Sequence, residues 1–225
     1  MGALSVILVT RLIGSDLDAV FETADLQKEA DVFFMNSEYL NTDTEPIAEA
    51  IAKSNTDIVA LVELNSRLSE QIRTSGRYPY AYYYPDLVFS FGFFSREPIL
   101  EQQTYFVGRY PIGVFRTTER TYYVVHPLPP FGTAAWERQR EFFSTLSALI
   151  GRTPNFLVLG DFNSTIYSSL FRAYFEPYFH RSVYSWGTDG PLAIPIDHAL
   201  SDTAIALRSG PKLSSDHVPL LVDTN

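Results

Sequence analysis

The sequence predicts an α/β protein in which two stacked mixed β-sheets are flanked by helices. Apolar runs of strand length occur in both halves of the 225-residue chain, and segments with helical spacing of apolar residues lie between them. Hydrophobic residues make up 46% of the chain and charged residues 19%, which excludes a disordered protein. The length fits one domain, which we expect at residues 31–225.

Residues 1–30 predict a leading segment outside this domain. Ser15 can cap an amphipathic helix, because the apolar residues that follow it recur with the spacing of one helical face. These apolar residues are Leu17, Val20, Phe21 and Ala24. The apolar run at residues 3–13 is too short to span a membrane, contains Arg11 and lacks the features of a signal peptide. Cytoplasmic and membrane-associated locations therefore both remain open.

A β-α-β unit is predicted at residues 32–62. Residues 32–35 and 58–62 are apolar runs of strand length, and Thr44 with the following Glu and Pro predicts the start of a helix between them. The two strands of such a unit are parallel, so their carboxyl ends meet at one edge of a sheet. We therefore expect Asn36 and Glu63, which follow these strands, to lie close together.

The middle of the chain predicts several strands of a mostly antiparallel region. Short apolar and aromatic runs, separated by Pro, Gly and charged residues, occur at 87–94, 99–107, 112–115 and 121–125. The tyrosine-rich segment 78–85 favours a strand that packs on a core. Base stacking or the lining of an apolar substrate channel is the alternative for this segment.

One helix and three strands complete the predicted elements. The helix is expected to be capped by Thr133 and to end at Gly151, and its buried residues are predicted to be Trp136, Phe143, Leu146 and Ile150. Residues 156–159 predict a strand that leads to Asp161. Residues 194–200 and 218–222 predict the last strands.

Four short polar clusters stand at the ends of predicted strands. They are Asn36 with Asn41, Glu63, residues 160–163 and residues 215–217. Side chains at strand ends can converge from distant parts of a sequence. Carboxylates, amides and imidazoles in a chain without cysteine suit a hard cation such as Mg²⁺. The absence of cysteine excludes thiolate catalysis and thiolate zinc sites.

Each cluster also has a structural interpretation. Asp161 and Asn163 can bind a metal or a phosphate oxygen, or they can form a turn that closes a strand. Asp216 and His217 can bind metal and transfer protons, or they can form a surface turn. Asp197 lies in an apolar run and would need a partner if buried, for which an imidazole is suitable.

His126 stands at the end of a predicted strand and before a rigid proline-rich loop. This position suits proton transfer or phosphate contact. The net charge of −9 argues against a protein that holds nucleic acid through a broad basic surface. It does not exclude a nuclease, because a bound divalent cation offsets local carboxylates.

In these residues the chain resembles the endonuclease/exonuclease/phosphatase superfamily, whose fold is DNase I-like. The matching residues occur in the order of that family: Asn36, Glu63, His126, Asp161, Asn163, Asp197, Asp216 and His217. The resemblance runs from about Asp31 to the end of the chain. Residues 126–130 and 196–198 are similar to a bacterial branch whose members are often membrane-anchored.

The resemblance implies a four-layer α/β/β/α sandwich and a phosphoesterase that depends on Mg²⁺, with Mn²⁺ as an alternative, and hydrolyses a phosphodiester. It implies that Glu63 is the main metal ligand, helped by Asn36 and Asp216. Asp161 and Asn163 would orient the attacking water and bind the phosphate.

The resemblance also implies that His217, paired with Asp197, acts as a base or phosphate ligand, and that His126 is the opposite phosphate ligand or acid. Family nucleases often pair this mid-chain histidine with a glutamate, and Glu119 is the candidate closest to it in sequence. No basic arm for gripping DNA is evident, and Arg116 and Arg120 suit a solvated surface.

Several alternatives remain open. The substrate class can be nucleic acid bound non-specifically, a phospholipid or a small phosphoester. A second hypothesis is a non-catalytic binding module that retains the fold, and a third is a purely structural protein. The sequence does not indicate an oligomeric state.

Overall fold

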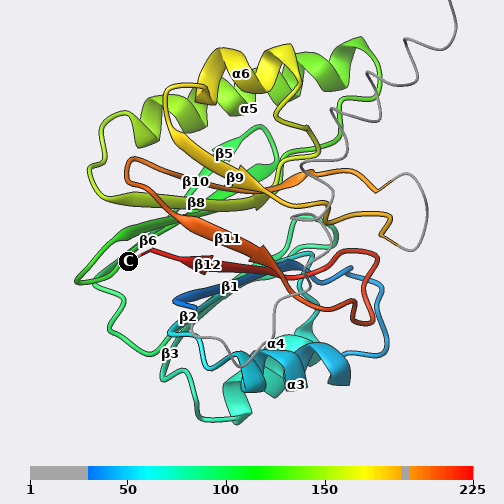
Figure 1. Cartoon of the computed structure of the whole chain (residues 1–225), viewed down its shortest axis with the longest axis vertical. Coiled ribbons are helices and arrows are strands. Elements are labelled where there is room, and N and C mark those ends of the chain that lie inside the picture. Colours follow the sequence, from blue (N-terminus) through cyan, green and yellow to red (C-terminus); the bar gives the residue numbers. More distant parts are fainter. Residues whose placement is uncertain (1–29, 189–192, 225) are drawn as a thin grey trace, which may run out of the picture.

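The computed structural model describes residues 30–188 and 193–224, so the predicted leading helix lies outside the described residues. Two six-stranded sheets lie face to face in the described part of the chain (Figure 1). Helices α5 (Thr133–Ile150) and α6 (Ser169–Phe175) cover the outer face of one sheet, and α3 (Glu45–Ser54) and α4 (Ser66–Thr74) cover the outer face of the other. The predicted four-layer α/β/β/α sandwich is confirmed.

The first sheet has the strand order β11-β12-β1-β2-β4-β3. Its strands are β1 (Val32–Asn36), β2 (Ile58–Val62), β3 (Tyr80–Tyr84), β4 (Phe91–Ser95), β11 (Ala206–Ser209) and β12 (Leu220–Asp223). Strands β1 and β2 are parallel and α3 connects them, which confirms the predicted β-α-β unit. Asn36 pairs with Val62 in the ladder, so it lies beside the residue that precedes Glu63.

The second sheet has the strand order β5-β6-β7-β8-β10-β9. Its strands are β5 (Glu101–Val107), β6 (Tyr110–Arg116), β7 (Thr121–Val125), β8 (Phe156–Asp161), β9 (Phe179–Ser182) and β10 (Asp197–Ser201). Strands β7 and β8 are parallel, and β8 pairs with β10 in antiparallel register. Asp161 and Asp197 are directly opposite in this ladder, so their side chains lie on the same face.

Phenylalanine fills the interior. The twelve largest side chains that are fully buried in the described structure are all phenylalanines, so most of the 17 in the chain serve packing. Between the sheets, the rings of Phe93 and Phe115 stack at a centroid distance of 4.3 Å. Under α5 and α6, Phe143 and Phe162 belong to a second core, and α3 and α4 cover a third.

The tyrosine-rich segment forms β3 at the edge of the first sheet. Tyr82 and Tyr84 pack against the core between the sheets, and the ring of Tyr84 stacks on Phe91. The structure thus supports the strand-packing interpretation of this segment. Within the described residues, no helix combines the length and apolar character needed to cross a bilayer.

Some predicted boundaries are wrong. The strand predicted at 87–94 begins only at Phe91, because Asp86 accepts the backbone N–H of Leu87 and closes a turn there. Thr133 is the first residue of α5, and the N-cap is Gly132, whose φ of +83° favours glycine. Trp136 is 43% exposed, because the buried face of α5 begins only at Gln139.

Candidate active site

The predicted site residues converge at a cavity of about 500 Å³. Six of them line its walls: Glu63, His126, Asp161, Asn163, Asp216 and His217. The other two, Asn36 and Asp197, are buried and hydrogen-bonded to lining residues. Asn41, which the sequence groups with Asn36, instead donates its amide to Ser214 and is not among the lining residues.

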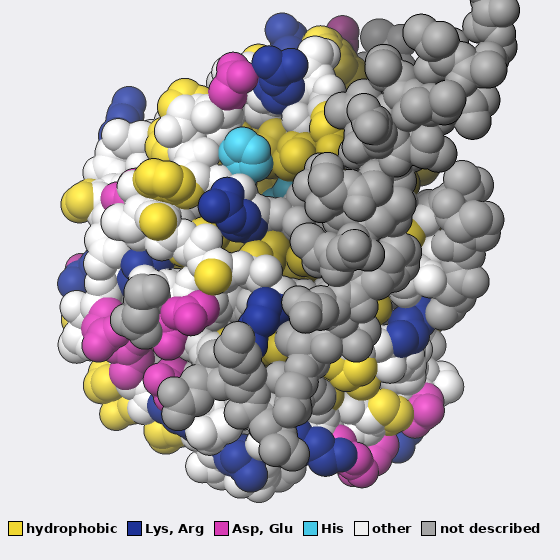
Figure 2. All heavy atoms as spheres, in the orientation of Figure 1, with side chains coloured by type: hydrophobic (Ala, Val, Ile, Leu, Met, Phe, Trp, Pro, Cys, Tyr) yellow, Lys and Arg dark blue, Asp and Glu magenta, His cyan; other side chains and the backbone are white. Residues whose placement is uncertain are grey.

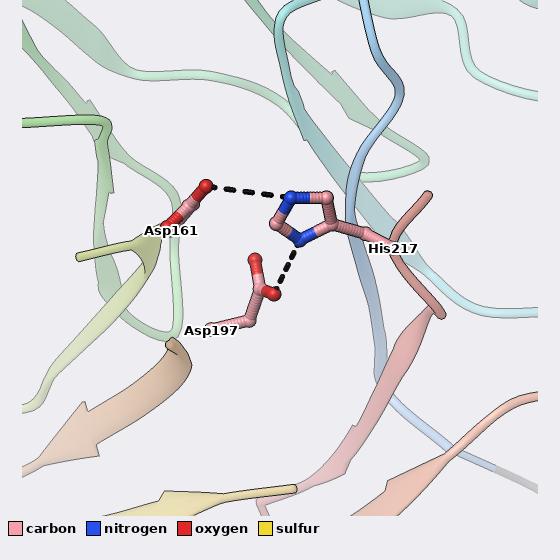
Figure 3. A group of neighbouring side chains, drawn as sticks. All are labelled: Asp161, Asp197 and His217. Atoms are coloured by element: carbon pink, nitrogen blue, oxygen red, sulfur yellow. Dashed lines mark hydrogen bonds and ion pairs between the residues drawn. The ribbon is translucent and has the colours of Figure 1, made fainter. Parts of the chain in front are cut away.

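His217 lies between two carboxylates, those of Asp197 and Asp161 (Figure 3). Its Nδ1–H donates to Asp197 Oδ2 at 2.6 Å, which confirms the predicted hydrogen bond between residues separated by 20 positions. Its Nε2 lies 3.6 Å from Asp161 Oδ2 and faces the cavity. Asp197 therefore fixes the orientation of the ring and leaves Nε2 available for chemistry.

The charges of this cluster shift two pKa values. Burial lowers the pKa of His217, but the charge and hydrogen bond of Asp197, followed by the charges of Asp161 and Asp216, raise it to about 9. Burial and the charge of Asp197 raise the pKa of Asp161 to about 6, although His126 and His217 oppose this. At neutral pH, His217 is an imidazolium ion beside a carboxylate that titrates near neutrality.

Asn36 joins the two sheets at the site. Its Nδ2 donates to Glu63 Oε1 and to Asp161 Oδ2, both at 3.0 Å, and its Oδ1 accepts the backbone N–H of Glu38 at 3.0 Å. The last bond sets the orientation of the amide, since only the oxygen can accept it. Two carboxylates from different sheets are thereby held around one amide group.

His126 is oriented by a backbone carbonyl. Its Nδ1–H donates to the carbonyl of Val88 at 3.2 Å, and its Nε2 accepts from Asn163 Nδ2 at 3.3 Å. The same Nε2 lies 3.7 Å from both Glu63 Oε1 and Asp161 Oδ2. Glu119 is exposed, is not among the cavity residues and does not pair with His126. The carbonyl of Val88 is therefore the partner of His126 in place of the expected glutamate.

Hydrogen bonds from both its backbone and its side chain hold Asn163 in place. Its backbone N–H donates to Asp161 Oδ1 at 2.9 Å, and its Nδ2 also donates to the carbonyl of Pro127 at 3.0 Å. Gly160 lies within β8 rather than in a turn, and a Cβ there would lie 2.5 Å from the carbonyl oxygen of Val125. The glycine lets β8 approach β7 closely beside His126.

Backbone strain also gathers at the cavity. Among the described residues, five that are not glycine have positive φ, and three of them line the cavity or are bonded to it: Glu38, Glu63 and Asn163. Asparagine tolerates this conformation, but glutamate rarely adopts it. Strained residues persist where the surrounding structure holds them, and they cluster at functional sites.

Trp186 is a cavity residue that the sequence did not reveal. Its Nε1–H donates to Asp216 Oδ2 at 2.8 Å, and its backbone forms bridges to Ile194 and His217. Nothing in the local sequence of Trp186 points to a carboxylate 30 positions away. His198, by contrast, is structural: it is buried under Phe162 and Phe171, and its Nε2–H donates to the carbonyl of Ser164.

Comparison with known proteins identifies the family. The model of the endonuclease/exonuclease/phosphatase family matches residues 32–217. The chain belongs to this family. Its members are phosphoester hydrolases that depend on a divalent metal, so the chain is placed among the metal-dependent phosphoesterases. No curated protein matches the chain by sequence.

Solved structures of the family share the fold. A 3′ phosphatase from Neisseria bound to a product DNA hairpin is 13% identical, with a TM-score of 0.68, and the match covers 87% of this chain and 99% of that one. Sphingomyelinase C from Streptomyces griseocarneus is 13% identical, with a TM-score of 0.67 and the same coverage of 87% and 99%. Truncated TDP2 from Caenorhabditis elegans is 13% identical, with a TM-score of 0.66 and coverage of 88% and 98%. At these identities the likeness shows the fold alone.

Two groups of residues could hold the metal of this family. Ligand atoms of Asp161, Asp197 and His217 lie within 4.8 Å of one another. However, the hydrogen bond between His217 Nδ1 and Asp197 Oδ2 already pairs two members of this group. The carboxylates of Glu63 and Asp216 are better suited, because both line the cavity and no lysine or arginine is among the described lining residues to neutralise them.

Proposed function

We propose that the protein is a phosphodiesterase that uses Mg²⁺, with Mn²⁺ as a substitute, and that the eight predicted residues form its active site. The arrangement of Glu63 and Asp161 carries this proposal. Their carboxylates come from different sheets, share the amide of Asn36 and lie equally close to His126. A cation bound at Glu63 offsets the negative charge that these two carboxylates concentrate, and it leaves Asp161 available as a base.

Glu63 is the main metal ligand in this proposal, Asn36 aligns it, and Asp216 supplies a further carboxylate at the cavity wall. The hydrogen bond from Trp186 fixes Oδ2 of Asp216, and Oδ1, which lies 3.9 Å from His217 Nε2, would be the oxygen that binds the metal. Bound Mg²⁺ would neutralise negative charge on the phosphate oxygens and on the leaving group.

The remaining residues perform the proton transfers. The oxygen of water bonds to phosphorus while one P–O ester bond breaks, and Asp161 accepts the proton that the water loses. Its raised pKa suits a base that works near neutral pH. The departing alkoxide takes a proton from Nε2 of His126 in its imidazolium form, in which Nε2 no longer accepts from Asn163. A diester and water thereby become a monoester and an alcohol.

His217 and Asn163 stabilise the phosphate. Nε2–H of the His217 imidazolium donates from the cavity wall, where negative charge builds up on the phosphate oxygens. When His126 carries a proton on Nε2, the Nδ2–H of Asn163 that pointed at this nitrogen is released and donates to the phosphate as well, while the other Nδ2–H stays on the carbonyl of Pro127. Asp197 stabilises the imidazolium and keeps Nε2 directed at the substrate.

The charge of the cavity favours a diester over a monoester. The described lining residues include four carboxylates, those of Glu38, Glu63, Asp161 and Asp216, and no lysine or arginine. A diester brings one negative charge into this cavity, whereas a monoester brings up to two. Repulsion therefore selects the diester.

Hydrolysis of two soluble esters tests the proposal. With Mg²⁺, the protein should hydrolyse bis(p-nitrophenyl) phosphate faster than p-nitrophenyl phosphate, and EDTA should abolish the activity until metal is restored. Asp161→Asn should lower kcat at least about 100-fold. Asp57→Asn, which removes a surface carboxylate paired with Arg96, is the matched control and should keep its activity.

Three results would contradict the proposal. They are faster monoester hydrolysis, activity that persists in EDTA, and full activity in Asp161→Asn. Metal binding without turnover of either ester would instead favour the non-catalytic binding module.

A further inference from the structure

The mouth of the active-site cavity is apolar and exposed. Four lining residues form what we call the apolar rim: Val88, Phe131, Trp186 and Ile194. Their exposed fractions are 46%, 86%, 39% and 37%. Large apolar side chains exposed together around a cavity are unfavourable in water and mark a surface that binds another apolar surface.

Three separate connections bring the apolar rim together. Val88 comes from the β3–β4 connection of the first sheet, and Phe131 comes from the proline-rich β7–α5 connection of the second. Trp186 and Ile194 come from the β9–β10 connection, where they pair through backbone hydrogen bonds. Residues this far apart in sequence meet only at the cavity, so the rim is part of the site and not a single exposed loop.

The charges around the cavity do not suit a polynucleotide. Protein–nucleic acid binding depends on lysine and arginine contacts to several phosphates, and the described lining residues include neither. Arg109 lies near the cavity residue Phe89, but its guanidinium covers that ring and faces Asp86 at 4.0 Å. On the face in Figure 2, Lys and Arg side chains form no broad continuous patch, and the Asp and Glu side chains that gather beside the C-terminal end marked in Figure 1 lie at the end of β12 away from His217.

We infer that the substrate is a zwitterionic phospholipid, cleaved at the surface of a bilayer. This inference rests on the proposed phosphodiesterase function. The phosphodiester lies at Asp161 and His217, and the apolar rim contacts the hydrocarbon region beside it. The carboxylate of Glu38, which the proposed function does not assign to the metal, attracts the ammonium group of the head group. Glu38 and the net charge of −9 repel an anionic lipid.

The chemistry is the hydrolysis described above. The oxygen of water bonds to phosphorus, one P–O ester bond of the lipid breaks, and the alcohol that leaves takes one proton. The products are a phosphate monoester and an alcohol.

Val88 connects the rim to the catalytic residues. Its side chain belongs to the rim, and its backbone carbonyl holds His126. A substitution of Val88 would change both, so it does not isolate lipid contact. Phe131 is the better test, because it is the most exposed rim residue and forms no hydrogen bond with a site side chain in the described structure.

Vesicle binding tests the inference without relying on turnover. Sedimentation with phosphatidylcholine vesicles should pull down the protein, and phosphatidylglycerol vesicles should bind it more weakly. Tryptophan emission should shift to the blue on binding, because the chain has two tryptophans and Trp186 lies on the rim. Phe131→Ser should weaken vesicle binding on the order of tenfold, since an aromatic ring no longer enters the bilayer.

Phe106→Ser is the matched control. Phe106 is also an exposed phenylalanine, but it lies on β5 and is not among the cavity residues. This substitution should leave vesicle binding unchanged. In the same preparations, Phe131→Ser should lower hydrolysis of phosphatidylcholine vesicles at least about fivefold more than hydrolysis of soluble bis(p-nitrophenyl) phosphate.

Each outcome separates the two proposals. If the soluble diester is hydrolysed but phosphatidylcholine vesicles are neither bound nor cleaved, the lipid inference is wrong and the phosphodiesterase function stands. Faster cleavage of single-stranded or duplex DNA than of lipid also overturns the inference, as does equal loss of both activities in Phe131→Ser. If no ester is hydrolysed, the proposed function fails, and so does the inference that rests on it.

Discussion

The positive charge of His217 depends on its hydrogen bond and ion pair with Asp197. The hydrogen bond between them is 2.6 Å long, and Asp197 outweighs the effect of burial in raising the pKa of the imidazole to about 9. We expect Asp197→Asn to lower this pKa, because the variant keeps the size of the side chain and loses its charge. An NMR titration can follow the ring, since the chain has only four histidines. A His217 pKa that stays near 9 in the variant would show that Asp197 is not the cause.

His198 also makes stability depend on pH, but its pKa is lowered, whereas that of His217 is raised. Burial lowers the pKa of its ring to about 4, and Nδ1 has no hydrogen-bond partner in the described structure. Below the ordinary pKa of about 6.5, the unfolded chain therefore binds a proton that the folded chain does not. The contribution of His198 to folding is present above about pH 6.5 and is lost as the pH falls towards 4.

We expect the free energy of unfolding of the wild-type protein to fall between about pH 7.5 and about pH 5 by about 2 kcal/mol more than that of His198→Gln. Glutamine cannot titrate and can still donate to the carbonyl of Ser164. Urea unfolding at the two pH values measures the difference. Equal falls in both proteins would refute the assignment of a neutral, buried His198.

The convergence of the eight candidate side chains was predictable from the sequence, but several of their partners were not. Glu63 and Asp161 are carboxylates at the ends of strands that are otherwise apolar. A charged residue at the end of an apolar run can be recognised from the sequence alone. The partner of His126 is a backbone carbonyl, which every residue carries, so nothing in the sequence marks Val88. The contact between Trp186 and Asp216 depends on how two long loops fold.

At the scale of elements, α5 supports two loops of the proposed active site through Gln139. This side chain is 1% exposed, and its Nε2 donates to the carbonyls of Leu128 and Phe162 at 3.1 and 3.2 Å. One carbonyl lies two residues after His126 and the other precedes Asn163. Gln139 therefore holds together the loops that carry a histidine and an amide of the site.

We expect Gln139→Leu to lower stability by about 1–3 kcal/mol, because two buried carbonyls lose their donor. It should also lower kcat more than it raises KM, since the loops position groups that act in the transition state. Gln71→Leu on α4 is the control, because Gln71 also forms hydrogen bonds from a helix but lies outside the cavity. Lower stability with unchanged kcat would give Gln139 a structural role only.

The strands buried on both faces were the most predictable elements. β1, β2 and β7 are fully buried along their length, so their sequences are continuous apolar runs. Helices α4 and α6 were not predicted because they are short. Their N-caps, Asn65 and Ser168, are recognisable only once each side chain is seen to accept a backbone N–H.

At the scale of the whole molecule, sheet register assembles the site. Asp161 lies opposite Asp197 in the second sheet, and Asn36 from the first sheet reaches across to Asp161. Hydrophobic pattern shows which segments are strands but not which residues are paired or how two sheets are stacked. The resemblance to a known family supplied the stacking of the two sheets, which the structure confirms, but not the register that places Asp161 opposite Asp197.

All eight predicted site residues lie within the described part of the chain. We therefore expect a chain that begins at Glu29 to remain folded and to keep Mg²⁺-dependent diester hydrolysis within about twofold of the full-length protein. Circular dichroism and the soluble-ester assay measure the two properties. A truncated protein that is folded but inactive would show that residues 1–28 shape the site.

Binding of Mn²⁺, counted by electron paramagnetic resonance, tests most directly whether the converging carboxylates form a metal centre. Glu63→Gln should weaken binding at least about tenfold, because it removes the charge of the main ligand. Glu119→Gln makes the same change at an exposed position outside the cavity and should bind like the wild type. Loss of Mn²⁺ binding in Glu63→Gln alone is the predicted result. Wild-type affinity in Glu63→Gln, or no binding by the wild-type protein, would contradict a metal centre at this site.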